Sequence, residues 1–301
     1  MITSRYPDYP SEELMHSGHL ACQGCGGSMI MRHVLKALGP DTIVIIPACC
    51  WTIIAGNFPY SSLKTPILHT LFETAAVAAS GVKAALEVQG NFDTKVLAFA
   101  GDGGTFDIGL QSLSGAAERN DDIIYVCYDN EAYMNTGIQR SSATPIKAWT
   151  TTTPVNDAKA ENKKNMVEIM AAHRIPYVAT ANAAYPTDLV EKVKRAASFK
   201  GTKFLHIMSP CPPGWKISSE MSIEVARLAT ETNIFPLYEI YNGERYQITF
   251  EPKKTKPVMD YLGVQGRFRH ITTEDAELIQ KRADFDWKML NHKCTMEVFE
   301  G

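Results

Sequence analysis

The sequence predicts an α/β protein in which a parallel sheet is covered by helices on both faces, a three-layer arrangement. Five short apolar runs rich in β-branched residues alternate with longer segments that carry apolar residues at three-to-four spacing. Such runs are typical of strands buried on both faces, and the longer segments are typical of the crossover helices that join parallel strands. The alternation of the two patterns therefore indicates a doubly wound sheet.

The elements follow from these two patterns in chain order. The predicted strands are the apolar runs at 42–47, 95–100, 122–128, 175–180 and 203–208. The predicted helices have an apolar face of period 3.6 and lie at 28–38, 73–88, 109–119, 186–197 and 218–230. Residues 145–165 are polar and lack a steady period, so a long loop is expected there.

A change of texture after residue 231 divides the chain into two predicted parts. Residues 1–231 are expected to form the α/β domain that carries the functional site. Residues 232–301 begin with a hairpin around Asn242-Gly243, a dipeptide that suits a type I′ turn, and continue into a charged helix near 273–290. This tail is expected to be an arm that packs on partner chains.

The composition excludes several classes of protein. With 301 residues, of which 45% are hydrophobic, the chain can bury a sizeable core. A net charge of -3 without a long basic block argues against nucleic acid or an anionic membrane as the partner. No long apolar span or signal-peptide pattern is found, so a cytoplasmic location is expected. Thiols stay reduced there, and the seven cysteines are not expected to form disulfides.

A glycine-acid turn follows the predicted strand 95–100 and precedes a helix. It consists of Gly101, Asp102, Gly103 and Gly104. Glycines let the backbone approach a phosphate closely, and a helix N-terminus favours an anion. Asp102 is compatible with a phosphate only if a cation lies between them, and Mg²⁺ fits this role. Alone, the turn is also compatible with an ordinary strand-to-helix connection.

A second polar stretch follows the next strand, in CYDNEAYMNTGIQR at 127–140. Ligands of doubly wound sheets bind at the carboxyl ends of the strands, and one crossover unit separates Asp102 from Asn130. Both side chains are therefore expected to face one crevice. The Asn130 amide oxygen and the Ala132 carbonyl would then complete a Mg²⁺ site with Asp102. Alone, Asn130 would be a turn residue.

These two stretches carry a resemblance to a known family. GDG followed at this interval by Asn is the signature of thiamine-diphosphate enzymes, and residues 101–154 resemble the β chains of pyruvate-type members of the 2-oxoacid:ferredoxin oxidoreductase family. The likeness covers roughly residues 17–240. It implies thiamine diphosphate and Mg²⁺ at this sheet edge. The cofactor-binding residues that it implies are Gly101, Asp102, Gly103, Gly104, Asn130, Ala132, Tyr133, Asn135 and Cys50.

Asn135 is the candidate catalytic residue, because a buried amide beside the cofactor needs a polar partner in cofactor or substrate. The roles of His19 and Glu73 stay open. His19 is compatible with a contact to cluster sulfurs or diphosphate and equally with a structural loop position. In the family, the glutamate that activates the thiamine ring lies on a partner chain, so Glu73 is expected to be structural or at an interface.

The cysteines suggest a second cofactor. Cys22 and Cys25 form a C-x-x-C pair, which alone is compatible with zinc, a redox pair or an iron-sulfur cluster. Further thiols follow the first and last predicted strands, on the same edge as the glycine-acid turn, and this nearness to a one-electron donor favours a [4Fe-4S] cluster. The resemblance implies the ligands Cys22, Cys25, Cys50 and Cys211. The choice between Cys49 and Cys50 stays open, and Cys127 and Cys294 are expected to be buried or incidental thiols.

The resemblance implies a reaction and a set of partners. The expected activity is oxidative decarboxylation of pyruvate to acetyl-CoA and CO₂, with reduction of ferredoxin. The expected partners are an α chain with a pyrimidine-binding domain, ferredoxin-like γ and δ chains, and ferredoxin as acceptor. The same chemistry on oxalate or on a branched-chain or aromatic 2-oxoacid stays open. From other classes, a non-catalytic nucleotide-binding module with structural zinc and a non-redox thiamine decarboxylase subunit stay open.

Overall fold

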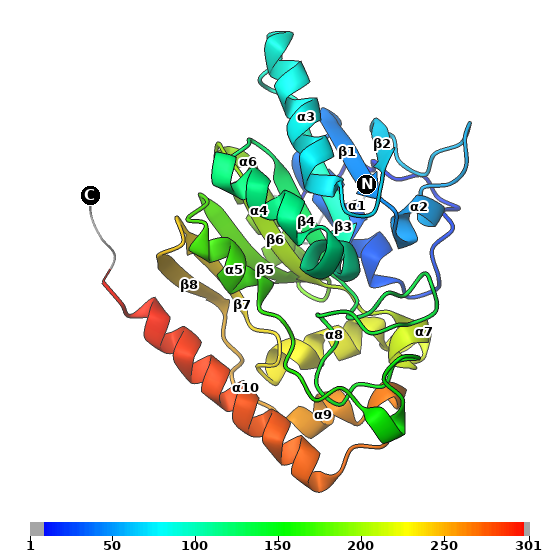
Figure 1. The fold of residues 1–301 in the computed structure, drawn as a ribbon, viewed down its shortest axis with the longest axis vertical. Helices are drawn as coiled ribbons and strands as arrows, with labels where there is room; N and C mark the ends of the chain where they lie inside the picture. Colours follow the sequence, from blue (N-terminus) through cyan, green and yellow to red (C-terminus); the bar gives the residue numbers. More distant parts are fainter. Residues whose placement is uncertain (1–8, 298–301) are drawn as a thin grey trace.

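An eight-stranded sheet forms the centre of the computed structural model, which describes residues 9–297 (Figure 1). The strand order is β2-β1-β3-β4-β6-β5-β7-β8. The first six strands in this order are parallel. Strand β7 pairs antiparallel with β5, and β8 pairs antiparallel with β7. The strands are β1 (Thr42–Pro47), β2 (Ile67–Thr70), β3 (Lys95–Gly101), β4 (Ile124–Asp129), β5 (Tyr177–Asn182), β6 (Lys203–Met208), β7 (Leu237–Tyr241) and β8 (Arg245–Phe250).

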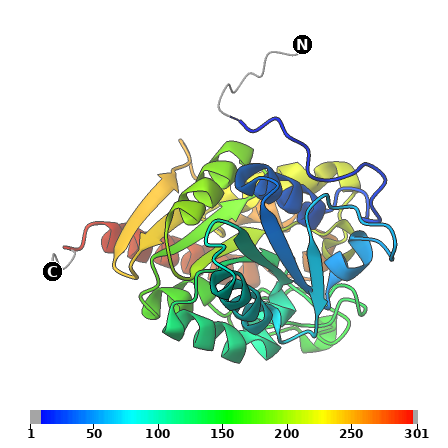
Figure 2. The same cartoon turned by 90° about the horizontal axis from the view of Figure 1, so that it is seen from above.

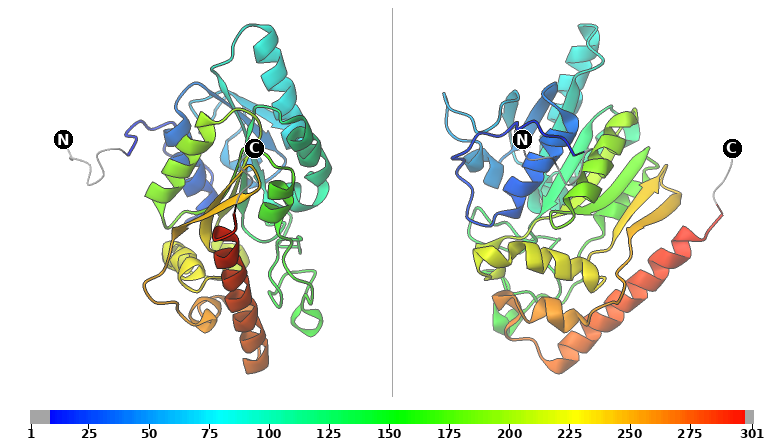
Figure 3. Two further views of the ribbon diagram at one scale, coloured as in Figure 1. Left: turned by 90° about the vertical axis from the view of Figure 1, so that its left-hand side faces the viewer. Right: turned by 180° about the vertical axis from the view of Figure 1, so that it is seen from behind.

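Helices cover both faces of the sheet, so the predicted three-layer α/β class is confirmed. Seen from above, α1 and α6 lie on one face and α3 and α4 on the other (Figure 2). The view with the sheet nearly edge-on shows the same two layers (Figure 3). The helices are α1 (Gly26–Leu38), α2 (Cys50–Ile54), α3 (Ala75–Val88), α4 (Leu110–Arg119), α5 (Met166–Ala172), α6 (Pro186–Ser198), α7 (Pro212–Trp215), α8 (Ser222–Glu231), α9 (Val258–Leu262) and α10 (Thr273–Cys294).

The inner strands of the sheet are buried on both faces, which explains their continuous apolar sequence. In β1, Val44 and Ile46 pack into the core beneath α1 and α6, whereas Ile45 packs into the core beneath α3 and α4. All three side chains are fully buried. Neighbouring residues of a strand point to opposite faces, so only an apolar run without polar alternation satisfies both cores.

The predicted elements are largely confirmed. The strands predicted at 42–47 and 203–208 coincide with β1 and β6, and the other three lie within two residues of their predicted bounds. The five predicted helices are also found, and residues 145–165 contain only one short 3₁₀ turn, Val155–Asp157. The edge strand β2 was not predicted, because its four residues are half-buried or exposed and form no apolar run.

The C-terminal part joins the same sheet. Its predicted hairpin is confirmed as β7 and β8, and both turn residues, Asn242 (φ 52°) and Gly243 (φ 72°), have the positive φ that a type I′ turn requires. Strand β7 pairs with β5, and α10 packs along β8 (Figure 1). That this part also packs on partner chains stays a prediction. No helix within residues 9–297 is long and apolar enough to cross a membrane.

Candidate functional site

The glycine-acid turn lies at the carboxyl end of β3, as predicted. The chain does not enter a regular helix directly: a π-helical turn, Gly103–Ile108, comes between Asp102 and α4. Gly103 is required here, because a Cβ atom at this position would lie 2.3 Å from Cε1 of Tyr133. The close approach of the Tyr133 ring thus explains one glycine of the motif without any ligand, and π-helical turns are frequent at functional sites.

The three predicted Mg²⁺ ligands meet at one point. One polar atom of the Asn130 side-chain amide lies 2.8 Å from the carbonyl oxygen of Ala132 and 2.9 Å from Oδ1 of Asp102. With its nitrogen in this place, the amide donates to both acceptors. With its oxygen there, three oxygen atoms converge and need a cation between them. The carboxylate, amide and carbonyl groups are those that Mg²⁺ prefers in proteins.

Asp102 has no cationic partner of its own within residues 9–297. Its side chain is 1% exposed, and Ser141 Oγ donates to Oδ2 at 2.5 Å. Burial raises the pKa of Asp102 well above its usual value, and the neighbouring Asp129 carboxylate raises it further. A divalent cation would offset both effects, because it favours the ionised form. The surroundings of Asp102 therefore fit a metal ligand.

Asp129, the last residue of β4, remains ionised beneath the site. Its carboxylate contacts Nζ of Lys163 at 2.5 Å and Nε2 of His206 at 2.7 Å. Burial alone would raise the pKa of Asp129, but Lys163 and His206 outweigh it and lower this pKa to about 2. An ionised carboxylate therefore lies close to Asp102 and raises the pKa of Asp102, although Lys163 pairs with it.

Glu131 holds the loop between Asn130 and Ala132, the two predicted ligand residues, and this role of Glu131 was not predicted. Its backbone is left-handed (φ 69°) although its side chain is only 2% exposed. Its carboxylate pairs with Lys163 at 2.8 Å and with Arg267 at 2.5 Å. A left-handed, non-glycine residue costs free energy and persists only where its contacts fix it. The two ion pairs provide such contacts.

Arg267 connects the C-terminal part of the chain to this loop. Its guanidinium group is 2% exposed and lies 4.1 Å from the ring centroid of Trp215, whose Nε1 donates to the carbonyl oxygen of Asn130 at 2.8 Å. The only sequence signal for this contact is an arginine in an otherwise ordinary loop. Its partner Glu131 lies 136 residues away along the chain, and no local pattern links the two.

Tyr133 and Asn135 have different surroundings from each other. Tyr133 is half-buried, donates to Oδ2 of Asp107 at 2.6 Å and packs edge-to-face against Phe72. Asn135 is exposed in the chain alone, so the expectation of a buried amide is wrong for this state. Asn135 is exposed because it lies in a solvent-facing turn that follows the predicted Mg²⁺ ligands along the chain. That both residues contact cofactor or substrate stays a prediction.

Four of the seven cysteines line one cavity of about 140 Å³, together with Asn130 and Asn135. These four are the predicted cluster ligands Cys22, Cys25, Cys50 and Cys211. Among residues 9–297, no three His, Cys, Asp or Glu side chains are close enough to share a single metal ion. The ligands of a cluster bind separate metal atoms around a larger centre, and thiols around a cavity fit that arrangement better than a single ion.

A close backbone approach brings the C-x-x-C segment to Cys211. The amide of Gly26 donates to the carbonyl oxygen of Pro210 at 2.9 Å. A Cβ atom on Gly26 would lie 2.6 Å from the Pro210 nitrogen, and one on Gly24, which has φ 71°, would lie 2.4 Å from the Ser219 carbonyl oxygen. Only glycine allows the two segments to touch here.

The thiols of this cavity raise one another's pKa. Burial raises the pKa of Cys50 to about 12, and the thiols of Cys49, Cys211, Cys25 and Cys22 contribute in the same direction. Burial likewise raises the pKa of Cys211 to about 12. Cluster ligands are thiolates, so these groups need a positively charged centre to lose their protons. The thiols are all free.

Cys49 and Cys50 differ in where their side chains lie. Cys50 lines the cavity, whereas the side chain of Cys49 accepts the backbone N–H of Thr52 as the cap of α2 and contacts Tyr128. Of the remaining thiols, Cys127 is fully buried in β4, as predicted, and Cys294 is half-buried in α10. The geometry favours Cys50 over Cys49 at the cavity.

Comparison with known proteins identifies the family. The model for the C-terminal TPP-binding domain of thiamine pyrophosphate enzymes matches residues 49–207. The ketoisovalerate oxidoreductase subunit VorB of Pyrococcus furiosus is 50% identical over 300 residues, covering 96% of both chains. The pyruvate synthase subunit PorB of Methanocaldococcus jannaschii is 50% identical over 292 residues, covering 94% of this chain and 98% of that one. The chain belongs to the 2-oxoacid:ferredoxin oxidoreductase family.

Within this family the chain corresponds to the β subunit, and it is an enzyme subunit with a TPP-binding domain. A solved structure agrees: 2-oxoglutarate:ferredoxin oxidoreductase from Magnetococcus marinus has a TM-score of 0.58 and 25% identity, covering 72% of this chain and 80% of that chain. The predicted resemblance, fold class and enzyme class are confirmed. The match begins at residue 49, so it includes the glycine-acid turn and Asn130 but not the C-x-x-C pair.

Proposed function

We propose that this chain is the β subunit of a complex that oxidises pyruvate to acetyl-CoA and CO₂ and reduces ferredoxin. The main observation in support is that Asp102, Asn130 and Ala132 converge next to a four-cysteine cavity at one edge of the sheet. The identity of 50% to a pyruvate synthase PorB supports the reaction class. We further propose a cytoplasmic location.

Thiamine diphosphate and Mg²⁺ would bind at the carboxyl ends of β3 and β4. Asp102, Asn130 and Ala132 would hold Mg²⁺, and the backbone of Gly101, Gly103 and Gly104 would face the diphosphate. When bound, thiamine diphosphate supplies the electron sink that lets a 2-oxoacid lose CO₂. The raised pKa of Asp102 and its contact with the Asn130 amide support this assignment.

A [4Fe-4S] cluster would be bound by Cys22, Cys25, Cys50 and Cys211, and it would accept electrons one at a time. The shared cavity of these thiols supports the assignment. Asn130 and Asn135 line the same cavity, so the two cofactor sites would be neighbours. The other three cysteines do not line the cavity, so the onward electron path would need other chains: ferredoxin-like γ and δ chains, with ferredoxin as acceptor.

The chain's own residues would mainly position and orient the cofactor ligands. Ser141 fixes the Asp102 carboxylate, and Glu131 with Arg267 fixes the loop that presents Asn130 and Ala132. Tyr133 covers the glycine turn, and Asn135 would contact cofactor or substrate once a partner chain encloses the site. An α chain with a pyrimidine-binding domain would complete the active site, so the isolated β subunit is expected to be inactive.

Pyruvate synthase and ketoisovalerate oxidoreductase subunits are equally similar to this chain, each at 50% identity, so the substrate needs its own test. The test is a panel of 2-oxoacids with the purified complex, followed by reduction of a viologen dye with and without coenzyme A. We expect the highest kcat/KM with pyruvate and a requirement for coenzyme A. A higher kcat/KM with ketoisovalerate would contradict pyruvate as the substrate. Activity on oxalate without coenzyme A would contradict the proposed transfer of an acyl group to coenzyme A.

The cofactor assignment is tested on the same preparation. Anaerobically purified complex is expected to contain iron and acid-labile sulfide in excess of what the ferredoxin-like chains hold. The purified β chain alone, reconstituted with iron and sulfide, should bind one cluster. Zinc without sulfide in this chain would contradict the cluster and favour a structural metal.

A further inference from the structure

A second cavity lies at the opposite edge of the sheet, at the amino ends of β3, β4 and β6. It has a volume of about 190 Å³ and is lined by residues of α3, the α3–β3 connection, α6 and the three strand starts. The site described above lies at the carboxyl ends of these strands, so the two cavities are separated by the length of the sheet. None of the predicted cofactor residues lines this one.

The lining is unusually basic. Four lysines and two aspartates face the cavity: Lys83, Lys95, Lys200, Lys203, Asp93 and Asp122. Lys83 and Lys203 are only 4% and 3% exposed, so their ammonium groups are removed from bulk water. Burying an ammonium group costs several kcal/mol unless an anion compensates it. The cavity thus has an excess of positive charge in a place where this excess is costly.

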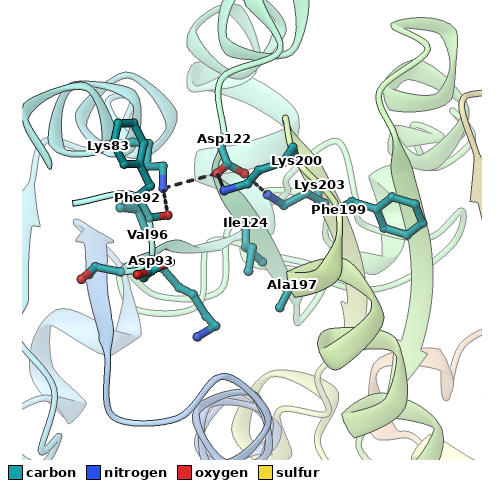
Figure 4. Close-up of a pocket in the computed structure, with 12 residues that line it drawn as sticks. Lys83, Phe92, Asp93, Val96, Asp122, Ile124, Ala197, Phe199, Lys200 and Lys203 are labelled. Atoms are coloured by element: carbon teal, nitrogen blue, oxygen red, sulfur yellow. Dashed lines mark hydrogen bonds and ion pairs between the residues drawn. The ribbon is translucent and has the colours of Figure 1, made fainter. Parts of the chain in front are cut away.

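One carboxylate is shared by three ammonium groups (Figure 4). Oδ1 of Asp122 lies 2.6 Å from Nζ of Lys203, and Oδ2 lies 3.3 Å from Lys83 and 3.4 Å from Lys200. Lys83 also donates to the carbonyl oxygen of Phe92 at 3.2 Å. Asp93, the other carboxylate at the cavity, is exposed and forms no ion pair within residues 9–297.

The pKa values of Lys203 and Asp122 are shifted by this excess of positive charge. Burial lowers the pKa of Lys203, Asp122 opposes this, and the ammonium groups of Lys83 and Lys200 lower it further. Burial alone would raise the pKa of Asp122, but the three lysines outweigh it and hold this pKa below its usual value. Asp122 is therefore fully ionised at neutral pH and still leaves the lysines under-compensated.

We propose that this basic cavity binds a small, multiply charged oxyanion of the phosphate class. Lys95 and Lys203 would contact the anion from the starts of β3 and β6, Lys200 from the connection between α6 and β6, and Lys83 from α3. The volume of about 190 Å³ exceeds by severalfold the roughly 30 Å³ share of one water molecule, so a phosphate group fits with part of its hydration shell. Asp122 holds the lysines in place when the anion is absent.

Phe92 adds a second feature to this site. The residue lines the cavity and is 58% exposed. An exposed aromatic ring beside a cluster of ammonium groups matches a phosphate ester with an apolar or planar substituent better than inorganic phosphate alone. The binding test needs only the shared phosphate group, and the proposal does not depend on the reaction at the opposite edge.

The experiment is isothermal titration of inorganic phosphate into the assembled complex, saturated with thiamine diphosphate and Mg²⁺ so that the carboxyl-edge site is filled. Chloride at equal ionic strength is the blank. The variant Lys95→Gln/Lys200→Gln removes two ammonium groups that are half-buried and exposed, so it should fold normally. We expect it to weaken phosphate binding by about tenfold or more.

The matched control is Lys253→Gln/Lys254→Gln, which changes the net charge equally at an exposed loop. It should bind phosphate like the unmodified chain. Equal loss in both double variants, or no phosphate binding by the unmodified complex, would overturn the site. Cofactor affinity and 2-oxoacid oxidation should be unchanged in the control, so a failure here is distinct from a failure of the proposed reaction.

A second measurement separates an anion site from a purely structural ion-pair network. Asp122→Asn removes the internal anion and leaves Lys83 and Lys203 buried without compensation. An anion site predicts that phosphate raises the Tm of this variant more than that of the unmodified complex, because the anion replaces the lost carboxylate. A lowered Tm that phosphate does not restore would show that the lysines serve only Asp122.

Discussion

Asp102 and Asp122 lie at opposite edges of the same sheet, and their surroundings have opposite character. Around Asp122 three lysines supply more positive charge than one carboxylate needs. Around Asp102, residues 9–297 supply oxygen atoms and a second carboxylate, but no cation in contact with it. The pKa of Asp122 is accordingly lowered and that of Asp102 raised. We propose that the amino edge binds an anion and that the carboxyl edge binds a cation.

The direct test of this difference is removal of Asp102. We expect Asp102→Ala to weaken Mg²⁺-dependent thiamine diphosphate binding by more than about a hundredfold, because the only charged residue among the proposed Mg²⁺ ligands is lost. Isothermal titration on the assembled complex measures this affinity. The control Asp157→Ala removes an exposed carboxylate from the loop at 155–157 and should leave the affinity unchanged. Unaltered affinity in Asp102→Ala would refute the metal site.

The paired cysteines offer an equally strong test of the thiol cavity. Cys50→Ser and Cys211→Ser should each lower the iron and sulfide content of the reconstituted chain by more than about half, because each removes one of the four proposed cluster ligands. Cys49→Ser is the matched control, since its side chain caps α2 and does not line the cavity. Iron analysis and the EPR signal of the reduced chain report the outcome. If Cys49→Ser loses the cluster and Cys50→Ser retains it, Cys49 is the cluster ligand and Cys50 is not.

Breaking the buried ion pair of Arg267 and Glu131 should lower cofactor affinity at the carboxyl edge less than the removal of Asp102 does. Arg267→Met leaves Glu131 buried with Lys163 as its single partner, and we expect a loss of about 2–3 kcal/mol in the free energy of unfolding. The loop that carries Asn130 and Ala132 would loosen, and cofactor affinity should fall by about tenfold. Arg269→Met, two residues away and exposed, is the control. Lower stability with unchanged cofactor affinity would restrict Arg267 to a structural role.

The two edges were not equally predictable from the sequence. The motif GDGG and Asn130 follow strands, and parallel strands place their carboxyl ends on one edge, so the contact of Asp102 with Asn130 was predicted from spacing alone. The four cavity thiols were identified through the family resemblance. Arg267 was missed because its contact with Glu131 depends on how the C-terminal part folds back. Lys83, Asp122 and Lys203 were missed because lysines and aspartates near strand starts are usual surface residues, and only the fold reveals their burial.

The smallest expected effect concerns the pH dependence of stability at the amino edge. The pKa of Asp122 is lowered in the folded chain, chiefly because the lysines outweigh burial. Its stabilising contribution is therefore fully present above the unfolded pKa of about 3.9 and is lost as the pH falls through the lower folded value. In Asp122→Asn this acid-dependent loss should disappear.

Urea unfolding of the β chain between about pH 3 and pH 7 measures this effect. Because Asp122 is partly exposed and its charge is screened, we expect the unmodified chain to lose less than about 1 kcal/mol through this group. Asp102 should behave in the opposite sense in the metal-free chain: its raised pKa means that ionisation costs stability as the pH rises, and added Mg²⁺ should remove this cost. Equal pH profiles for the Asp122→Asn variant and the unmodified chain would mean that the three lysines do not act on this carboxylate as a group, and the contrast between the two edges would then depend on Asp102 alone.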